Sequence, residues 1–242
     1  KLEIRQKKFS LILPCYNEEA IFEESIQEIT KTLDKAKIDY EIIFVEDAST
    51  DNTKNLIKEV LKKNKKFKAI FHKKNLGRGG SVAEGIKVAK GKIVGFIDID
   101  LEVSPKYIPQ MIEKIDQGYD IVCGKRYYDF SLQRIFRDFL HTAYLKIADM
   151  LISLPVSDPN GAYKFFKREK ILPIIDKTLD KHWFWETELL KRASLEGLKI
   201  IEVPVKYSTN YKKKTTVKVF QDTIYFIKKL FWFKKELERS KK

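Results

Sequence analysis

Short apolar runs alternate with segments of helical periodicity in the first half of the chain. The runs are four to six residues long and rich in β-branched and aromatic side chains, as buried strands are. They are Phe9–Pro14, Tyr40–Val45, Lys68–Phe71 and Ile93–Ile97. Strands and helices that alternate with short connections predict an α/β fold, in which helices cover both faces of a mostly parallel sheet. Ligands bind such sheets at the carboxyl ends of the strands.

The segments between these runs have apolar residues three and four positions apart, which is typical of amphipathic helices. Three helical faces are defined by Ile21, Phe22, Ile26, Ile29 and Leu33; by Leu56, Ile57, Val60 and Leu61; and by Ile108, Met111, Ile112 and Ile115. Ser49 or Asp51 can cap the second of these helices. Ser104 and Pro105 can begin the third, and Gly118 can end it.

The second half of the chain is less regular. We predict strands at Ile121–Gly124, Tyr163–Phe166 and Ile200–Val205, and helices at Leu132–Leu151 and at Glu186–Glu196, which Gly197 closes. From Tyr211 onward the chain is rich in lysine, and its apolar positions share one helical face: Val217, Phe220, Ile224, Ile227 and Leu230 or Phe231. We therefore expect one α/β domain over residues 1–210, followed by a basic amphipathic helix over residues 211–242.

The chain of 242 residues carries 48 Lys and Arg against 34 Asp and Glu, a formal net charge of +14. This excess favours a polyanionic partner, which could be a nucleic acid, an anionic membrane or a phosphorylated small molecule. Two cysteines exclude a disulfide scaffold and favour a reduced, cytoplasmic setting. No apolar run reaches the roughly 18 residues of a membrane span, and no signal peptide is recognisable at the N-terminus.

The strongest chemical signal is the acidic sequence Asp98-Ile99-Asp100-Leu101-Glu102, which follows a predicted strand. Acidic residues two positions apart at a strand end point the same way. A hard divalent cation would offset their repulsion and could bridge them to a diphosphate. We therefore predict that Asp98 and Asp100 bind metal. Glu102 would be either a third ligand or a residue that supports the first two without binding the metal itself. The alternative is a solvated acidic loop.

Three further segments follow predicted strands or open predicted helices. They are Pro14–Glu19, Glu46–Asp51 and Asn75–Gly80, and the last is a glycine-rich turn that contains Arg78. Backbone N–H groups at such turns can bind phosphate, and a carboxylate in the second segment can accept N–H bonds from a nucleobase. Helix capping is the alternative explanation for the acidic and hydroxyl side chains of these segments.

Together, these four segments resemble the motifs of the family 2 glycosyltransferases with the GT-A fold. The matching motifs are P-x-Y-N-E, E/D-D-x-S-x-D, N-x-G-[KR]-G-G and D-x-D-L. The chain looks most like the polyprenyl-phosphate sugar transferases of the dolichyl-phosphate mannose or glucose synthase kind. In the second half, Gly124–Tyr127, Asp158–Lys164 and Trp185–Leu190 stand where those enzymes carry G-x-R-Y, D-T-x-x-G-x-K and F-D-x-E-L-L.

The resemblance implies a role for each of these residues. Residues 1–124 would form the nucleotide-sugar half and residues 125–210 the acceptor half. The donor would be bound by Pro14, Tyr16, Glu18, Asp47, Arg78 and Asp98, with Mg²⁺ or Mn²⁺ held by Asp98, Asp100 and Glu102. The acceptor phosphate would be bound by Arg126, Arg134 and Arg137, because guanidinium groups bind phosphate in a fork and stay charged. The alternative for Arg134 and Arg137 is a solvated basic face.

Glu186 and Glu188 follow His182 in an aromatic setting, at the start of a predicted helix. A carboxylate there could serve as the base for a hydroxyl acceptor. A phosphate acceptor is already ionised, so the carboxylate would instead orient the acceptor or support the metal site. An acidic helix N-terminus without further function is the third interpretation. The expected catalytic residues are Asp98, Asp100, Arg126 and Glu186.

The expected reaction moves a hexose, mannose or glucose, from a GDP- or UDP-sugar to a polyprenyl phosphate, with inversion. The resemblance supplies the inversion and the lipid. The alternative acceptor is a sugar or another hydroxyl compound. A nucleic-acid-binding module is a distant alternative, because no known binding signature is present. The basic helix at the end suggests a cytoplasmic protein peripheral to, or tethered at, an anionic membrane surface, or else a helix that docks on the domain.

Overall fold

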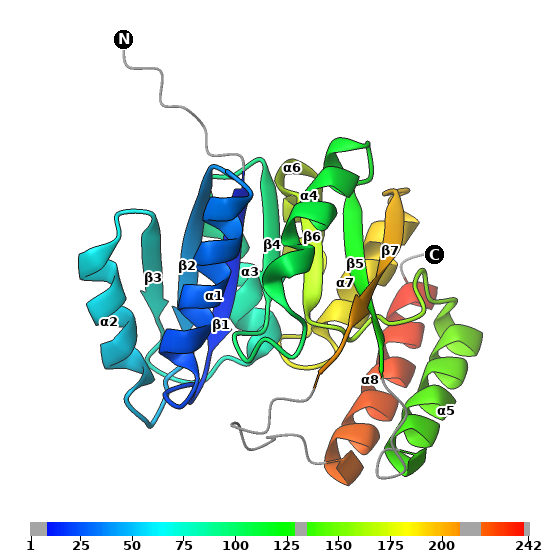
Figure 1. The fold of residues 1–242 in the computed structure, drawn as a ribbon. Helices are drawn as coiled ribbons and strands as arrows, with labels where there is room; N and C mark the ends of the chain where they lie inside the picture. The colour runs from blue at the N-terminus through cyan, green and yellow to red at the C-terminus, as the bar shows by residue number, and fades with distance from the viewer. Residues whose placement is uncertain (1–8, 129–134, 209–218, 240–242) are drawn as a thin grey trace.

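The protein is an α/β structure with one seven-stranded sheet, in a computed structural model that describes residues 9–128, 135–208 and 219–239 (Figure 1). The strands are β1 (Phe9–Cys15), β2 (Tyr40–Glu46), β3 (Phe67–Phe71), β4 (Ile93–Ile97), β5 (Ile121–Tyr127), β6 (Tyr163–Lys167) and β7 (Ile200–Lys206). They lie in the order β3-β2-β1-β4-β6-β5-β7. Every pair is parallel except those of β6, which is antiparallel to β4 and β5. The predicted mixed, mostly parallel sheet is confirmed.

Helices cover both faces of the sheet. They are α1 (Phe22–Lys35), α2 (Thr53–Lys63), α3 (Arg78–Val88), α4 (Ile108–Asp116), α5 (Ile135–Ile152), α6 (Arg168–Lys177), α7 (Trp185–Leu195) and α8 (Val219–Arg239), with a 3₁₀ turn, η1 (Pro105–Tyr107). Alternate side chains of each strand enter opposite layers. Leu11 of β1 packs in the layer with α1 and α4, whereas Ile12 packs in the layer with α3, α6 and α7. This alternation follows from the two-residue period of a strand.

The structure refines several predicted boundaries. Most strands run one to three residues further than the apolar pattern indicated, and the largest extension, in β5, includes Arg126 of the site. Helix α6 was not predicted, since Pro173 lies inside it and interrupts the helical signal. Asn52, and not Ser49 or Asp51, is the N-cap residue of α2, although Asp51 Oδ1 accepts the Thr53 N–H at 3.0 Å. The predicted start of the helix at Leu132 lies outside the described residues.

Ser104 begins η1 as expected, because its side chain accepts the Lys106 N–H and Pro105 takes the first position. Gly118 and Gly197 follow the ends of α4 and α7 with φ of +107° and +74°, in the left-handed region that glycine adopts readily. Both predicted helix ends are confirmed.

Helix α8 lies beside α5 at one end of the sheet (Figure 1). Their shared apolar cluster contains Tyr144, Ala148 and Ile152 of α5, Leu230 and Phe233 of α8, and Phe184 from the segment before α7. The predicted apolar face of α8 is only partly the one that packs, because Ile224 and Phe231 remain about half exposed. Val217 lies outside the described residues, as does the side chain of Phe220. No helix in the described part of the chain is long and apolar enough to cross a membrane.

Candidate active site

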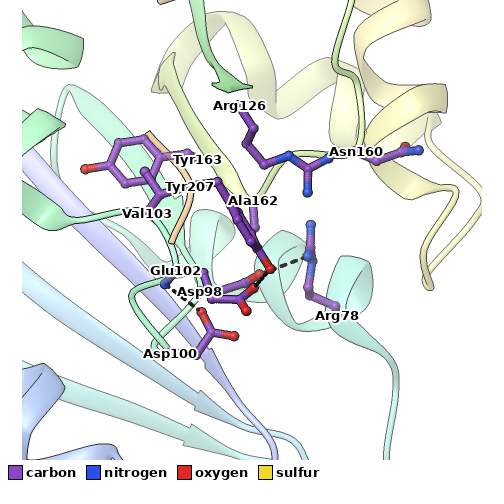
Figure 2. A pocket seen from close by; sticks show the side chains of 10 residues that line it. All are labelled: Arg78, Asp98, Asp100, Glu102, Val103, Arg126, Asn160, Ala162, Tyr163 and Tyr207. Carbon is purple, nitrogen blue, oxygen red and sulfur yellow. Dashed lines mark hydrogen bonds and ion pairs between the residues drawn. The ribbon is translucent and has the colours of Figure 1, made fainter. Parts of the chain in front are cut away.

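A small pocket lies where the loop after β4 meets the start of α3 and the ends of β5 and β7 (Figure 2). Its lining residues are Arg78, Asp98, Asp100, Glu102, Val103, Arg126, Asn160, Ala162, Tyr163 and Tyr207. Figure 2 shows the two guanidinium groups on one side of the pocket and the carboxylates on the other. With about 50 Å³ of space, it can hold an ion and part of a phosphate group, but not a complete nucleotide sugar.

Arg78 connects the acidic strand end to α7. Its Nη1 lies 3.2 Å from Asp98 Oδ2, and its Nη2 pairs with Glu186 Oε1. The guanidinium also lies over the rings of Phe96 and Trp183, at 5.9 and 5.3 Å from their centroids. The Arg78 side chain is mostly buried, and its charge is offset by these two carboxylates and by the aromatic faces.

The start of α3 is placed by close backbone contacts. Gly77 has a φ of +85°, and a Cβ there would lie 2.3 Å from His182 Nδ1. A Cβ on Gly79 would lie 2.3 Å from Trp185 Cβ. Glycine at these two positions therefore lets the Arg78 turn lie directly against the segment before α7.

The acidic loop after β4 turns sharply, because Leu101 has a φ of +53° and Asp100 Oδ1 accepts the Glu102 N–H at 3.2 Å. Glu102 Oε2 accepts a hydrogen bond from the Tyr207 hydroxyl. Burial raises the pKa of Tyr207, and the hydrogen bond to Glu102 raises it further, so the hydroxyl remains a donor. Tyr207 was not identified from the sequence, because nothing in the local pattern links it to a residue 105 positions earlier.

The three predicted metal ligands line the same pocket but are not equivalent. Asp98 and Asp100 present carboxylate oxygens, the ligands that Mg²⁺ and Mn²⁺ prefer. Glu102 is engaged by Tyr207, and no three His, Cys, Asp or Glu side chains gather into a metal-binding set within the described ranges. The cation beside Asp98 in this structure is the Arg78 guanidinium, which shows that positive charge is accommodated there. The residues therefore fit a metal held by Asp98 and Asp100.

Arg126 of β5 is held by Asp158 through two parallel bonds. Arg126 Nε lies 2.8 Å from Asp158 Oδ2 and Nη2 lies 2.7 Å from Oδ1, while the Arg126 N–H donates to the same carboxylate at 3.1 Å. Burial alone would raise the pKa of Asp158, but the hydrogen bonds from Arg126 outweigh it and lower the pKa. This pair fixes the plane of a guanidinium that lines the pocket.

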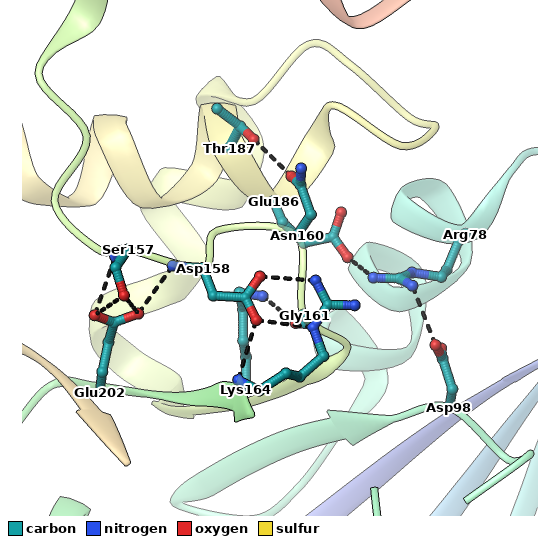
Figure 3. Close-up of polar contacts among 11 residues, drawn as sticks. Arg78, Asp98, Ser157, Asp158, Asn160, Gly161, Lys164, Glu186, Thr187 and Glu202 are labelled. Atoms are coloured by element: carbon teal, nitrogen blue, oxygen red, sulfur yellow. Dashed lines mark hydrogen bonds and ion pairs between the residues drawn. The ribbon is translucent and has the colours of Figure 1, made fainter. Parts of the chain in front are cut away.

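The loop that carries Asp158 is itself held from two sides. Glu202 of β7 accepts the N–H groups of Ser157 and Asp158, each at 3.0 Å (Figure 3). Lys164 of β6 is fully buried, and its Nζ donates to the carbonyl of Gly161. Burial lowers the pKa of Lys164 to about 8. From the sequence, Asp158–Lys164 was identified only through the family resemblance. The contacts that Glu202 and Lys164 make with this loop were not predicted.

At the edge that the resemblance assigns to the donor, the segments that follow β1 and β2 are bonded to each other. Asn17 Oδ1 accepts the Thr50 N–H at 2.8 Å, and the Glu18 N–H donates to Thr53 Oγ1 at 2.7 Å. Tyr16 is exposed, Pro14 is partly buried and Glu18 is buried. These residues line the loop edge that the resemblance assigns to the nucleoside.

Asp47 is buried at the end of β2 and accepts several hydrogen bonds from within the chain. Its Oδ1 accepts the Leu76 N–H at 2.8 Å, and its Oδ2 accepts the Gly77 N–H at 2.9 Å. His72 lies between two carboxylates, with Nδ1 2.7 Å from Asp47 Oδ1 and Nε2 3.0 Å from Glu84 Oε2. Burial alone would lower the pKa of His72, but these two bonds outweigh it and raise the pKa. His72 was not singled out from the sequence.

The remaining predicted residues divide into two groups. Glu186 is 1% exposed and points toward Arg78 (Figure 3). Glu188 is also buried and accepts the N–H groups of Leu179 and Asp180. Arg134 lies outside the described residues, and Arg137 lies in α5 with its side chain outside them, so their predicted contact with phosphate stays a prediction.

The fold and the pocket define a class of α/β protein in which a mixed, mostly parallel sheet presents an acidic strand end opposite fixed guanidinium groups. The model of the family described as "Glycosyl transferase family 2" matches residues 10–173. The chain belongs to this family, which confirms the identification made from the motifs.

Two curated relatives extend this result. Over 220 residues, the chain is 26% identical to the glycosyltransferase AglD of Haloferax volcanii, a match that covers 89% of this chain and 35% of the relative. Over 122 residues, it is 33% identical to the uncharacterized glycosyltransferase YkcC of Bacillus subtilis, covering 50% of this chain and 38% of the relative. The matched segments thus span little more than a third of these relatives.

Solved structures share the fold at low identity. A glucosyl-3-phosphoglycerate synthase of Mycobacterium tuberculosis, in complex with Mn²⁺, UDP and glucosyl-3-phosphoglycerate, has a TM-score of 0.67 and 19% identity, covering 93% of this chain and 80% of that one. The mannosyltransferase PcManGT of Pyrobaculum calidifontis, in complex with GDP-mannose and Mn²⁺, has a TM-score of 0.63 and 19% identity, covering 91% and 61%. These likenesses confirm the GT-A fold.

Proposed function

We propose that this protein is a metal-dependent, inverting hexosyltransferase that uses a nucleotide diphosphate sugar as donor and a polyprenyl phosphate as acceptor. The observation that carries the proposal is the shared pocket of Asp98, Asp100 and the Asp158-held Arg126. An acidic edge suited to a metal and a fixed guanidinium suited to a phosphate face this pocket from opposite sides, as the transfer of a sugar between two anions requires.

At the donor side, Asp98 and Asp100 would hold Mg²⁺ or Mn²⁺. The metal would supply positive charge against the diphosphate. Arg78 lies next to Asp98 and provides a second, permanent positive charge for the same leaving group. The two solved relatives bound Mn²⁺ together with UDP or GDP-mannose, which supports this assignment but does not decide the nucleotide or the sugar.

At the acceptor side, Arg126 would hold the acceptor phosphate in line with the sugar. An oxygen of that phosphate attacks the anomeric carbon, and the bond from this carbon to the diphosphate oxygen breaks with its electron pair leaving on the nucleotide. The acceptor is ionised before it binds, so the reaction requires no proton acceptor. The buried pairing of Glu186 with Arg78 supports an orienting role for Glu186.

A phosphorylated hydroxyl compound is the second candidate acceptor. The glucosyl-3-phosphoglycerate synthase was solved in complex with glucosyl-3-phosphoglycerate and, separately, with phosphoglyceric acid. In such a compound Arg126 could bind the phosphate while a hydroxyl attacks the sugar. This reaction would release a proton and would give Glu186 the role of base.

Membrane association would bring the enzyme to a polyprenyl substrate. Ile224 and Phe231 of α8 and Met150 of α5 are exposed apolar side chains, and Lys228 and Lys235 of α8 are exposed cations. Apolar side chains flanked by lysines are the composition of a surface that binds anionic lipid headgroups. We propose that the α5–α8 pair lies at the membrane surface.

Calorimetry with UDP, GDP and their glucose and mannose conjugates, with and without Mn²⁺, tests the donor assignment. We expect metal-dependent binding of one nucleotide series. Transfer assays with that donor then compare a short-chain polyprenyl phosphate with 3-phosphoglycerate. The proposal is refuted if none of these nucleotides or nucleotide sugars binds in a metal-dependent way. If sugar is transferred only to 3-phosphoglycerate, the hydroxyl compound replaces the polyprenyl phosphate as the acceptor.

A further inference from the structure

Helix α8 is joined to the segment before α7 by one buried carboxylate. The Asp180 side chain is fully buried, in the segment between α6 and α7. Its Oδ2 accepts the Tyr225 hydroxyl at 2.6 Å and lies 2.8 Å from Lys229 Nζ. Its Oδ1 accepts the His182 N–H at 2.8 Å. One carboxylate thus bonds both to α8 and to the chain that leads into α7.

A second contact lies one turn further along α8. The rings of Phe184 and Phe233 are fully buried and meet edge to face with centroids 5.8 Å apart. Tyr225, Lys229 and Phe233 are four residues apart and therefore share one face of α8. Helix α8 holds the 180–184 segment at both of its ends, through Asp180 and Phe184.

The held segment forms the surface against which the Arg78 turn packs. The Gly80 N–H lies in the first turn of α3, where a helix offers no carbonyl of its own, and it donates to Lys181 O at 2.8 Å. Gly77 lies too close to Lys181 and His182 for any side chain at that position. Displacement of this segment would therefore move the backbone that carries Arg78.

The same segment also carries the side-chain partners of Arg78. Trp183 lies under the guanidinium, at 5.3 Å from ring centroid to Cζ, and Glu186 pairs with it in the first turn of α7. A continuous set of contacts therefore runs from α8 through Asp180 and the 180–184 segment to the guanidinium beside Asp98.

We propose that Asp180 is a positioning residue for the transfer reaction: by tying α8 to the 180–184 segment, it sets the place of Arg78 opposite the donor diphosphate. This inference rests on the proposed function for its catalytic consequence, but not for the tether itself. Helix α8 then acts on the active site in addition to any contact with a membrane. Burial raises the pKa of Tyr225, and the bond to Asp180 raises it further, so the tyrosine remains a hydrogen-bond donor to the carboxylate.

The test compares Lys229→Met and Tyr225→Phe with Asp180→Asn in the full chain. The first two variants change partly exposed α8 residues, so they keep the test decisive if the buried Asp180→Asn variant fails to fold. Lys177→Met is the matched control, because Lys177 forms an exposed pair with Glu196 on the neighbouring surface, at 2.7 Å.

Two readouts are measured for each variant. Hydrogen exchange of the Gly80 amide, followed by NMR, reports the contact between α3 and Lys181, while the Ile12 amide in β1 reports global opening. Steady-state kinetics separates kcat from the KM of the acceptor. In the Asp180, Tyr225 and Lys229 variants we expect the Gly80 amide to exchange faster while the exchange rate of the Ile12 amide stays the same. We expect kcat to fall by about tenfold with little change in the acceptor KM, as happens when a group at the reacting centre is misplaced.

Unchanged Gly80 exchange and kcat in the α8 variants would overturn the proposal. Equal acceleration at Gly80 and Ile12 would also overturn it, because the tether would then serve stability only. If the wild-type chain neither binds nucleotide with Mn²⁺ nor transfers sugar, the proposed function fails, whereas the Gly80 exchange still decides the tether.

Discussion

Arg78 and Glu186 form an ion pair between the first turns of α3 and α7, 108 residues apart in the sequence. The same guanidinium reaches Asp98 Oδ2 at 3.2 Å, so it joins the acidic strand end to a buried carboxylate. A carboxylate paired with a permanent cation is stabilised in its charged form and is a weak proton acceptor. The pair therefore favours an orienting role for Glu186.

Glu186→Gln separates the two acceptor classes. With a polyprenyl phosphate acceptor we expect kcat to fall by less than about tenfold, because no proton is removed. With a hydroxyl acceptor, loss of a base would lower kcat by about 10²- to 10⁴-fold. Glu196→Gln is the control, since Glu196 lies in an exposed pair with Lys177. A large loss on the phosphate acceptor would contradict the orienting role.

Asp98→Asn and Glu102→Gln should differ in their effect on metal. Asp98 lines the pocket beside a cation, whereas Glu102 accepts the Tyr207 hydroxyl. We expect Asp98→Asn to abolish the Mn²⁺-dependent part of nucleotide binding and to lower kcat by at least about 10²-fold. Glu102→Gln should leave most of the metal affinity. Calorimetry measures both, with the exposed Asp39→Asn as control, and equal losses would make Glu102 a ligand after all.

Asp158→Asn should act on the acceptor and not on the donor. The variant removes the charge that holds the Arg126 guanidinium in its plane. Removing one partner of such a buried ion pair lowers the free energy of unfolding by roughly 3 to 5 kcal/mol. We expect the acceptor KM to rise by about tenfold or more while the dissociation constant of the metal–nucleotide complex stays the same. Kinetics at fixed saturating donor measures the first, and calorimetry the second. A matching loss of nucleotide affinity would place Arg126 at the donor.

His72 should make the free energy of unfolding depend on pH above its unfolded pKa, about 6.5. Its pKa is raised in the folded protein by Asp47 and Glu84. A raised pKa means that the stabilisation is complete below the unfolded value, near about 6.5, and is lost as the pH rises through the folded value. We expect the difference in unfolding free energy between wild type and His72→Gln to be larger at about pH 6 than at about pH 9. A difference that grows with pH would contradict the assignment.

Phe231→Asp should weaken binding to anionic vesicles. Phe231 is 50% exposed on α8 and does not belong to the apolar cluster that joins α5 and α8. Loss of one inserted aromatic side chain and addition of a negative charge should lower the vesicle partition constant by about tenfold or more. Leu195→Asp is the matched control, because Leu195 is equally exposed, at 54%, on α7. Sedimentation with vesicles checks both, and equal losses would place the contact elsewhere.

Much of the fold and one edge of the site could be predicted from the sequence, because the signals for them lie in residues that are close together along the chain. The runs that became β1, β2 and β4 are buried on both faces and are therefore almost wholly apolar. In parallel strands the polar residues that follow such runs meet at one edge of the sheet. Asp47 and Asp98 could accordingly be placed at that edge before the structure was known. Helix α6 could not, because Pro173 obscured its pattern.

The sequence alone determined the order of the motifs, the acidic strand end and the glycine-rich turn, since each depends on residues only a few positions apart. The tertiary structure decided what these groups face. Asp158 fixes Arg126, Tyr207 engages Glu102, and Asp180 holds α8, in contacts that span 32, 105 and 45 residues of chain. A local pattern carries no information about such pairs, because the folded sheet and its packed helices bring them together.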